Sequence, residues 1–261
     1  VISRYEVTLK MIQYFIRRAC GNLFVPPNVM ICIPSGITEV EERAVKDAAR
    51  EAGARRTYLI EEPTAAAIGA GLNIYAPEGN MVVDIGGGTT DIAVLSLGGV
   101  VVSESIKIAG DKFDEAIARY VRRKYKVLIG ERSAEAIKKR IGTVYSRPQL
   151  LSMEVKGRCV NQGLPKVITV TPKEMIEALA EPVTAILDAI CTVIEKTPPE
   201  LLGDILRNGI VMTGGGSLLY GFDQLVTRAT GIKTRVAPDA VSCVALGTGK
   251  SLDNLDMFEA K

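Results

Sequence analysis

The stretch Met81–Gly99, MVVDIGGGTTDIAVLSLGG, decides how the fold of this chain is read. An apolar run ends in Asp84, three glycines follow at once, and two threonines and Asp91 lead into a second apolar run. Glycines let backbone N–H groups approach an anion closely, so this order favours a phosphate-binding turn between two strands. A tight hairpin without a ligand is the plain alternative. A second cluster, Gly214–Gly216, also follows an apolar run, and the two clusters together favour a nucleotide site.

Neither cluster matches the common nucleotide-binding fingerprints. A GxGxxG motif would need glycine at the positions of Asp91 and Leu219, so neither cluster is a Rossmann fingerprint. The sequence contains no GxxxxGK[ST] motif, which excludes a P-loop ATPase.

The composition narrows the classes of function. The chain has 261 residues, enough for one large domain or two lobes. Its net charge of +2, from 32 basic and 30 acidic residues, argues against a nucleic-acid-binding surface. It has no histidine, which excludes the usual catalytic triads, and its five cysteines lack paired zinc-ligand spacing. They are typical of reduced thiols in a cytoplasmic protein. No apolar run is long enough to span a membrane.

The order of strands and helices predicts an α/β fold. Strand-like and helix-like runs alternate over residues 29–69, with Pro63 in the first turn of a helix. Three β-rich runs over residues 81–108 predict antiparallel hairpins, helices are expected near 111–125 and 133–141, and another hairpin is expected over 151–170. Three pairs are expected to form capping boxes at helix starts: Thr38 with Glu41, Thr171 with Glu174, and Thr197 with Glu200.

Four motifs in order resemble the actin, heat-shock-chaperone and sugar-kinase ATPase superfamily. DIGGGTT at Asp84–Thr90 resembles its second phosphate motif, and VMTGGGSLL at Val211–Leu219 resembles its adenosine motif. EPTAAAIGAG from Glu62 and AVSCVALGTGKSL from Ala240 resemble its two connecting helices. The resemblance implies an actin-like (ribonuclease H-like) two-lobed ATPase fold, with mixed sheets flanked by helices.

Three further stretches resemble the MreB family of bacterial actins, which determine rod shape. They are IPSGITEVEERAVKDAAREAGA, IGERSAEAIKKRIG and EKTPPELLGDILRNGIVMTGGG. The likeness runs over nearly the whole chain but starts part-way into the family's first domain, so we expect an N-terminal truncation that omits the first phosphate motif. On this basis, residues 1–70 are expected to be the rest of the first lobe, 71–250 the second lobe, and 240–261 a connecting helix returning to the first. We therefore expect this chain alone to bind ATP weakly and to turn it over negligibly.

The resemblance assigns the phosphate and metal contacts to the first glycine cluster. Asp84 would hold Mg²⁺ through water, because Mg²⁺ dehydrates reluctantly and prefers a few carboxylates plus phosphate oxygens. Gly86, Gly87, Gly88 and Thr89 would hold the β- and γ-phosphates. The plain alternative for Asp84 is a strand-end aspartate that caps the glycine turn.

The resemblance also assigns the attacking water to Glu62, with Thr89 assisting. An acid at this position is equally explained by the helix dipole, and Glu61 beside it carries the same charge. Glu62 is preferred because the resemblance places the polarising residue directly before the proline. Phosphoryl transfer to water depends mostly on positioning and charge stabilisation, so this chemistry does not need histidine.

The adenosine contacts are expected from two further segments. Glu135 and Lys138 are one turn apart on a predicted helix and share a face, which the resemblance puts against the adenosine. An exposed ion pair is the alternative. Gly214, Gly215, Gly216 and Ser217 would pass under the α-phosphate and the adenine.

The segment GNLFVPPN places Leu23 and Phe24 in a turn that follows Arg17 and Arg18. A loop that tucks two apolar residues into the core explains it. The MreB resemblance instead implies a loop that dips into the membrane, with basic neighbours.

Together these features predict an ATP-dependent, Mg²⁺-using actin-like protein. By resemblance it would form homopolymer filaments on the inner face of the cytoplasmic membrane and guide cell-wall synthesis through membrane-spanning partners. Two alternatives stay open. One is another ATPase of the superfamily, such as a sugar kinase or a chaperone ATPase, and the other is a scaffold that does not hydrolyse ATP.

Overall fold

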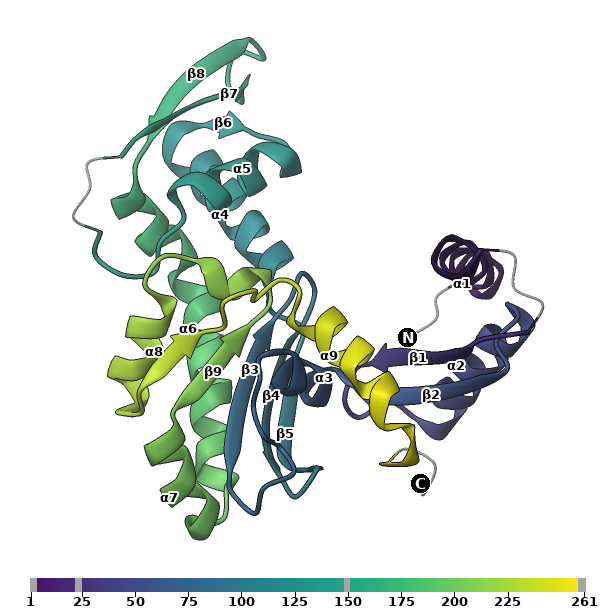
Figure 1. Ribbon diagram of the computed structural model, residues 1–261. Coiled ribbons are helices and arrows are strands. Elements are labelled where there is room, and N and C mark those ends of the chain that lie inside the picture. The colour runs from purple at the N-terminus through teal and green to yellow at the C-terminus, as the bar shows by residue number, and fades with distance from the viewer. Residues whose placement is uncertain (1–3, 22–24, 148–150, 258–261) are drawn as a thin grey trace.

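The computed structural model describes residues 4–21, 25–147 and 151–257. Its elements form a small lobe and a larger one, with two short helices between them (Figure 1). Within the described ranges, no helix combines the length and the apolar character needed to cross a membrane.

The smaller lobe is built from the first four elements. They are α1 (Tyr5–Cys20), β1 (Asn28–Ile33), α2 (Glu39–Glu51) and β2 (Arg56–Glu61). β1 and β2 pair in parallel, and Gly21 is the C-cap of α1. The expected capping box of Thr38 and Glu41 forms at the start of α2. α1 buries none of its residues and leaves apolar side chains such as Met11 and Phe15 exposed.

The larger lobe is centred on a five-stranded sheet in the order β10-β9-β3-β4-β5. Its strands are β3 (Asn80–Ile85), β4 (Thr90–Ser96), β5 (Gly99–Ile106), β9 (Ile210–Thr213) and β10 (Thr234–Val236). β3, β4 and β5 are antiparallel, as the sequence predicted, whereas β9 joins β3 in parallel. The parallel pairing brings the ends of β3 and β9, and hence both glycine clusters, to the same edge of the sheet.

Helices cover the two faces of this sheet. The main apolar cluster packs one face against helices that include α6 (Pro172–Lys196) and α7 (Pro199–Asn208), and α8 (Phe222–Thr230) also contributes. α3 (Glu62–Gly69) packs on the other face, where a smaller cluster includes Val82 and Ala93.

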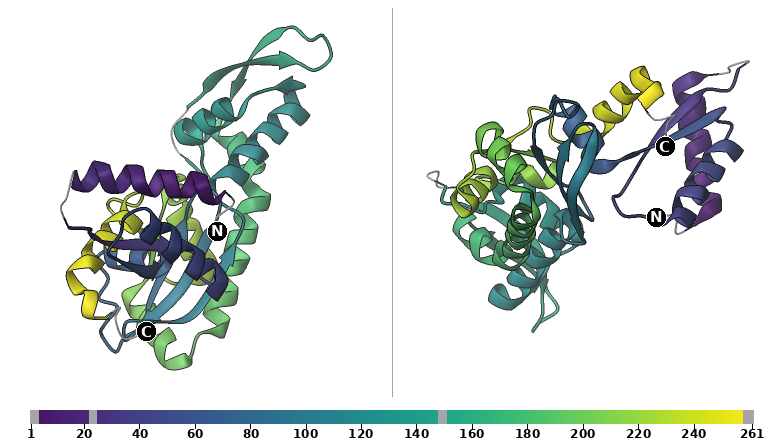
Figure 2. Two further views of the ribbon diagram at one scale, coloured as in Figure 1. Left: turned by 90° about the vertical axis from the view of Figure 1, so that its right-hand side faces the viewer. Right: turned by 90° about the horizontal axis from the view of Figure 1, so that it is seen from below.

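A subdomain extends from the larger lobe. It holds α4 (Gly110–Tyr125), α5 (Glu131–Ile141) and a three-stranded antiparallel sheet of β6 (Val127–Leu128), β7 (Met153–Cys159) and β8 (Pro165–Val170). The antiparallel pairing of β7 and β8 confirms the hairpin that the sequence predicted in this region. Viewed from the side, this sheet projects away from the five-stranded sheet (Figure 2).

The two lobes meet through α3 and α9 (Cys243–Ser251), which lie side by side between them (Figures 1 and 2). Glycines allow the two helices to approach to backbone contact. A methyl group at Gly69 would overlap the carbonyl oxygen of Cys243, and one at Gly247 would overlap the carbonyl oxygen of Ala65. Glycine is therefore the residue that this crossing requires.

One predicted capping box is wrong. Thr197 does not cap α7, because its hydroxyl donates to the carbonyl oxygen of Val193 in the preceding helix, at 2.7 Å. Pro198 takes the cap position instead, and α7 begins at Pro199. The short connection between α6 and α7 leaves Thr197 bound to the end of α6.

The capping box at the start of α6 is extended by contacts from α4. Glu174 accepts hydrogen bonds from the backbone N–H and the hydroxyl of Thr171, both at 2.8 Å. Its other oxygen accepts from Lys124 Nζ and from the Tyr125 hydroxyl, both at 2.6 Å. One buried carboxylate thus joins the start of α6 to the end of α4.

We expect Glu174→Ala to lower the free energy of unfolding by about 2 kcal/mol, because it removes a helix cap and charged hydrogen bonds together. Urea denaturation measures this change. Glu181→Ala on the same helix is the control, because Glu181 makes only a largely exposed ion pair with Arg119, at 3.7 Å. Equal midpoints for the two variants would contradict a stabilising role for Glu174.

Candidate functional site

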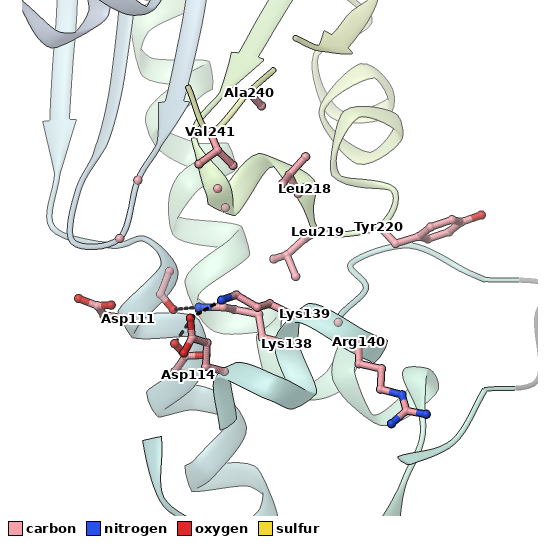
Figure 3. Close-up of a pocket in the computed structure, with 18 of the residues that line it drawn as sticks. Asp111, Asp114, Lys138, Lys139, Arg140, Leu218, Leu219, Tyr220, Ala240 and Val241 are labelled. Carbon is pink, nitrogen blue, oxygen red and sulfur yellow. Dashed lines mark hydrogen bonds and ion pairs between the residues drawn. The ribbon is translucent and has the colours of Figure 1, made fainter. Parts of the chain in front are cut away.

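A cleft of ≈ 970 Å³ opens beside the edge of the five-stranded sheet and is shown in Figure 3. Its lining comes from the β3–β4 turn, the start of α4, the inner face of α5, Arg147, the segment after β9, and the residues that lead into α9. The sequence-predicted residues among its lining are Asp84, Gly86, Gly87, Glu135, Lys138, Gly214, Gly215 and Gly216. The fold therefore brings both glycine clusters and the predicted adenosine residues to one cavity.

The second glycine cluster packs directly against Ile85, the residue that precedes the first cluster. Gly214 has a φ of +79°, and a methyl group there would overlap the carbonyl oxygen of Ile85. A methyl group at Gly216 would overlap the Ile85 side chain. The second cluster is thus glycine-rich partly because β3 and β9 end in contact, a packing requirement in addition to the expected ligand contact.

Asp84 lies at the junction of these clusters. It is buried at the end of β3, lines the cleft, and its Oδ1 accepts a 2.7 Å hydrogen bond from the Thr213 hydroxyl of β9. Burial raises the pKa of Asp84, the hydrogen bond from Thr213 opposes this, and the charge of Asp91 adds to the rise.

The start of α4 forms part of the site that the sequence did not predict. The backbone N–H of Gly110 donates to the Gly86 carbonyl at 3.1 Å, and that of Asp111 donates to the Gly87 carbonyl at 2.8 Å. The N-cap of α4, Ala109, offers no side-chain hydrogen bond. A helix that starts at Ala-Gly-Asp without a Ser or Thr cap was the signal in the sequence that could have pointed to this contact.

The two predicted adenosine residues, Glu135 and Lys138, each pair with another residue and not with one another. Lys138 Nζ donates to Asp114 Oδ2 at 2.7 Å and to the Gly110 carbonyl at 2.9 Å, as the dashed lines in Figure 3 show. Glu135 pairs instead with Lys139, at 2.6 Å, on a more exposed part of α5. Lys138 therefore ties α5 to α4, and Asp114 is a cleft residue that sequence reasoning missed.

At the outer rim of the cleft, Arg147 stacks on Tyr220. The guanidinium carbon lies 4.7 Å from the centre of the Tyr220 ring, and both residues line the cavity. No motif in the sequence links them, because they are distant in the chain. They meet where the segment after α5 pairs with Tyr220 through Thr143 and Val144.

Glu62 begins α3 and is half-buried near two other carboxylates. Burial and then the negative charges of Asp91 and Asp84 raise the pKa of Glu62 to about 7. The neighbouring Glu61 accepts a 3.2 Å hydrogen bond from the Ser35 hydroxyl. The carboxylates of Asp84 and Asp91 thus act on Glu62, while the Glu61 side chain is bound to Ser35.

Asp91 is 1% exposed, and neither of its carboxylate oxygens has a hydrogen-bond partner. Across the described part of the chain, no three His, Cys, Asp or Glu side chains are grouped so that they could hold a metal ion by themselves. A cation at these acids would need oxygen ligands from water or from a bound phosphate.

The remaining predicted residues lie outside the cavity lining or outside the described chain. Gly88 and Thr89 belong to the turn, and the Gly86 N–H donates to the Thr89 carbonyl at 2.9 Å. Ser217 is buried, and its hydroxyl donates to the Gly214 carbonyl at 2.6 Å. Leu23 and Phe24 lie outside the described residues.

Curated relatives match nearly the whole chain. MreB of Escherichia coli strain K12, a cell shape-determining protein, is 51% identical over 259 residues, which cover 98% of this chain and 75% of the relative. Mbl of Bacillus subtilis strain 168, also a cell shape-determining protein, is 51% identical over 257 residues, with 98% and 77% covered.

Solved structures match the fold equally broadly. MreB 5 of Spiroplasma citri bound to AMPPNP has a TM-score of 0.94 and 39% identity, with 98% of this chain and 78% of that chain covered. A MamK double helical filament, at 22% identity and a TM-score of 0.80 over 95% of this chain and 75% of that chain, shares the fold. These matches confirm the predicted actin-like fold. The family model of the MreB/Mbl protein matches residues 1–260, and the chain spans about three quarters of relatives to which it is about half identical. The chain therefore belongs to the MreB/Mbl family.

Proposed function

We propose that this protein binds ATP in the cleft and is an actin-like cytoskeletal protein of cell shape. The observation that carries the proposal is that one cavity gathers Asp84, the β3–β4 turn, the glycines after β9 and the inner face of α5. Relatives in the family are named cell shape-determining, and MreB5 of Spiroplasma citri has been solved with AMPPNP and with ADP. We infer that the same cleft takes the nucleotide here.

The acids at this site fit a hydrated Mg²⁺ bound with the nucleotide. Asp84 lines the cleft, and Asp91 has two buried oxygens without partners, so the site carries negative charge that the protein does not neutralise. Mg²⁺ keeps several waters and is usually bound by one or two carboxylates plus substrate phosphates. When bound, it would neutralise charge on the phosphate oxygens. Asp84 is the residue proposed to hold it through water.

The chain's own residues would position the phosphates and the attacking water. We propose that the turn of Gly86, Gly87 and Gly88 holds the β- and γ-phosphates, with the Thr89 hydroxyl beside them. The Gly86 N–H already donates to the Thr89 carbonyl and closes this turn, so the N–H groups proposed to face the phosphates are those of Gly87 and Gly88. Glu62, whose pKa is raised to about 7, would accept a proton from the water or orient it. Lys138 and Glu135 on α5, with Gly214–Ser217 below, would hold the adenosine.

We also propose the finer cellular role and domain division. The protein would form homopolymer filaments on the inner face of the cytoplasmic membrane and act with membrane-spanning proteins of cell-wall synthesis. Residues 1–70 would belong to the first lobe, 71–250 to the second, and 240–261 would return to the first. The family membership supports this role over a sugar kinase or chaperone ATPase.

Calorimetry tests the nucleotide proposal. The full-length protein should bind Mg²⁺–ATP, and Asp84→Ala should weaken that binding by about 10- to 100-fold, as is typical when an outer partner of a metal site is lost. Asp223→Ala on α8, which is outside the cleft lining, is the control. No binding of ATP by the unsubstituted full-length protein would refute the proposed function.

The membrane proposal has its own test. Fully burying one side chain such as Leu23 or Phe24 is worth about 1.5–3 kcal/mol, so a monomer would bind lipid only marginally. In a filament, repeated loops act together, and avidity multiplies affinity by about 10²–10⁴. We expect a Leu23→Ser, Phe24→Ser double variant to polymerise but to fail to sediment with anionic liposomes.

The outcome against this idea is loss of folding. If the double variant unfolds or becomes much less stable in urea, the two side chains belong to the core, and the membrane role of the loop must be given up.

A further inference from the structure

Asp91 is a buried carboxylate that the proposed nucleotide contacts do not use. It is 1% exposed, and neither of its oxygens accepts a hydrogen bond. The proposed contacts with the metal, the water and the phosphates are assigned to Asp84, Glu62 and Thr89, so Asp91, the second acid of the stretch Met81–Gly99, has so far only been counted in the charge of the site. A fold does not retain an unpaired buried carboxylate without a cost, because the charge loses its hydration and gains nothing in return.

The strand register places Asp91 beside the metal-binding edge. Asp91 is directly opposite Asp84 in the antiparallel pair of β3 and β4. Residues opposite each other lie on the same face of a sheet. Their neighbours two residues away on each strand pack on the face that α3 covers, and α3 begins with Glu62. Asp84 lines the cleft and Asp91 does not, so Asp91 is next to Asp84 in the sheet without facing the cavity.

A purely structural role does not explain this residue. The Thr213 hydroxyl stabilises Asp84, whereas Asp91 receives no donor. Protonation would leave a carboxylic acid that is also buried without a partner. Like charges directly opposite on neighbouring strands destabilise the pair further. Residues that violate the rules of folding in this way are typical of functional sites.

We propose that Asp91 is the second anion of the nucleotide site, a buried charge next to Asp84 that raises the affinity of the site for a hydrated Mg²⁺ without touching the ion. This inference rests on the proposed function. Because Asp91 is closed off from solvent, its charge acts through a medium of low dielectric and is weakly screened by salt. The described chain offers no group of three metal ligands, so the ion must keep waters or phosphate oxygens, which an outer charge can stabilise.

The test compares nucleotide affinity with and without the metal. Calorimetry measures ATP binding to the full-length protein in Mg²⁺ and in EDTA, and the ratio of the two affinities is the readout. In Asp91→Asn we expect this ratio to fall by about 10- to 100-fold, the range typical for outer partners of a metal. The affinity in EDTA should not fall, because the lost charge repels the triphosphate. Asp91→Glu keeps the charge and should keep most of the ratio.

The stability of the nucleotide-free protein is a second readout. Replacing a residue that only stabilises the fold would lower stability, whereas replacing Asp91 is expected not to. The urea midpoint of nucleotide-free Asp91→Asn should equal or exceed that of the unsubstituted protein, because the variant removes an unpaired buried charge. Asp188→Asn, an exposed acid on α6, is the control for loss of one negative charge and should change neither readout.

The possible results separate this inference from the proposed function. If the unsubstituted protein binds ATP more tightly with Mg²⁺ and Asp91→Asn does so equally, only the role of Asp91 is overturned. A clear loss of stability in Asp91→Asn would also overturn it. If the unsubstituted protein shows no Mg²⁺ dependence, the proposed metal and this inference both fail.

Discussion

Replacing Gly247 with alanine is expected to lower the free energy of unfolding by about 3 kcal/mol, the upper end of the range for overpacking. The new methyl group would overlap the backbone carbonyl oxygen of Ala65 in α3, which cannot move aside as a flexible side chain would. The two helices would have to separate, and they are the elements that lie between the lobes. ATP binding should therefore weaken as well. Urea denaturation and calorimetry on the full-length protein measure the two effects.

The same helix provides a matched control. At Gly249, no atom of the described residues, apart from the chain neighbours and the backbone of α9 itself, lies within 4 Å of the position where a Cβ would be. Alanine is the better helix former, so Gly249→Ala should raise stability by about 0.5–1 kcal/mol. The same substitution two residues apart is thus expected to have opposite signs. A loss in Gly249→Ala as large as in Gly247→Ala would show that the helix itself, and not its contact with α3, sets the cost.

The sequence predicted most of the fold because local signals were strong. The β3–β4–β5 hairpins follow from three β-rich runs separated by glycines, and the capping boxes at Thr38 and Thr171 formed as the pattern indicated. The same pattern failed at Thr197. A hydroxyl near the end of one helix and the start of the next can bond to either, and here it bonds back to Val193. The sequence pattern alone does not determine to which of the two helices the Thr197 hydroxyl bonds.

The site was only partly predictable, for a different physical reason. Asp84 and the glycine clusters could be predicted to line a site because the residues of a phosphate-binding turn are consecutive in the sequence. The contact of Lys138 with Asp114 joins two helices, and the stack of Arg147 on Tyr220 joins residues far apart in the chain. Asp91 stands in the quoted motif, but the sequence does not show that its carboxylate is buried without a hydrogen-bond partner. Such features depend on tertiary packing and became apparent only with the fold.

The pair Glu61 and Glu62 allows the proposed hydrolysis to be tested at the level of single adjacent residues. In the full-length protein, Glu62→Ala should preserve ATP binding and slow phosphate release by about 10²-fold or more, the range of a positioned general base. The residue would contact the water and not the nucleotide, so affinity should change little. Single-turnover phosphate release and calorimetry give the two quantities separately.

Glu61→Ala is the matched control, because it removes the same charge one residue earlier. Its carboxylate already accepts a hydrogen bond from Ser35, while burial and the charges of Asp91 and Asp84 raise the pKa of Glu62 to about 7. A base with a pKa near the working pH combines a large ionised fraction with a useful affinity for a proton. If Glu61→Ala loses turnover and Glu62→Ala does not, the water is positioned by the first acid. In that case the raised pKa of Glu62 would have no role in catalysis and would only reflect its burial near Asp91 and Asp84.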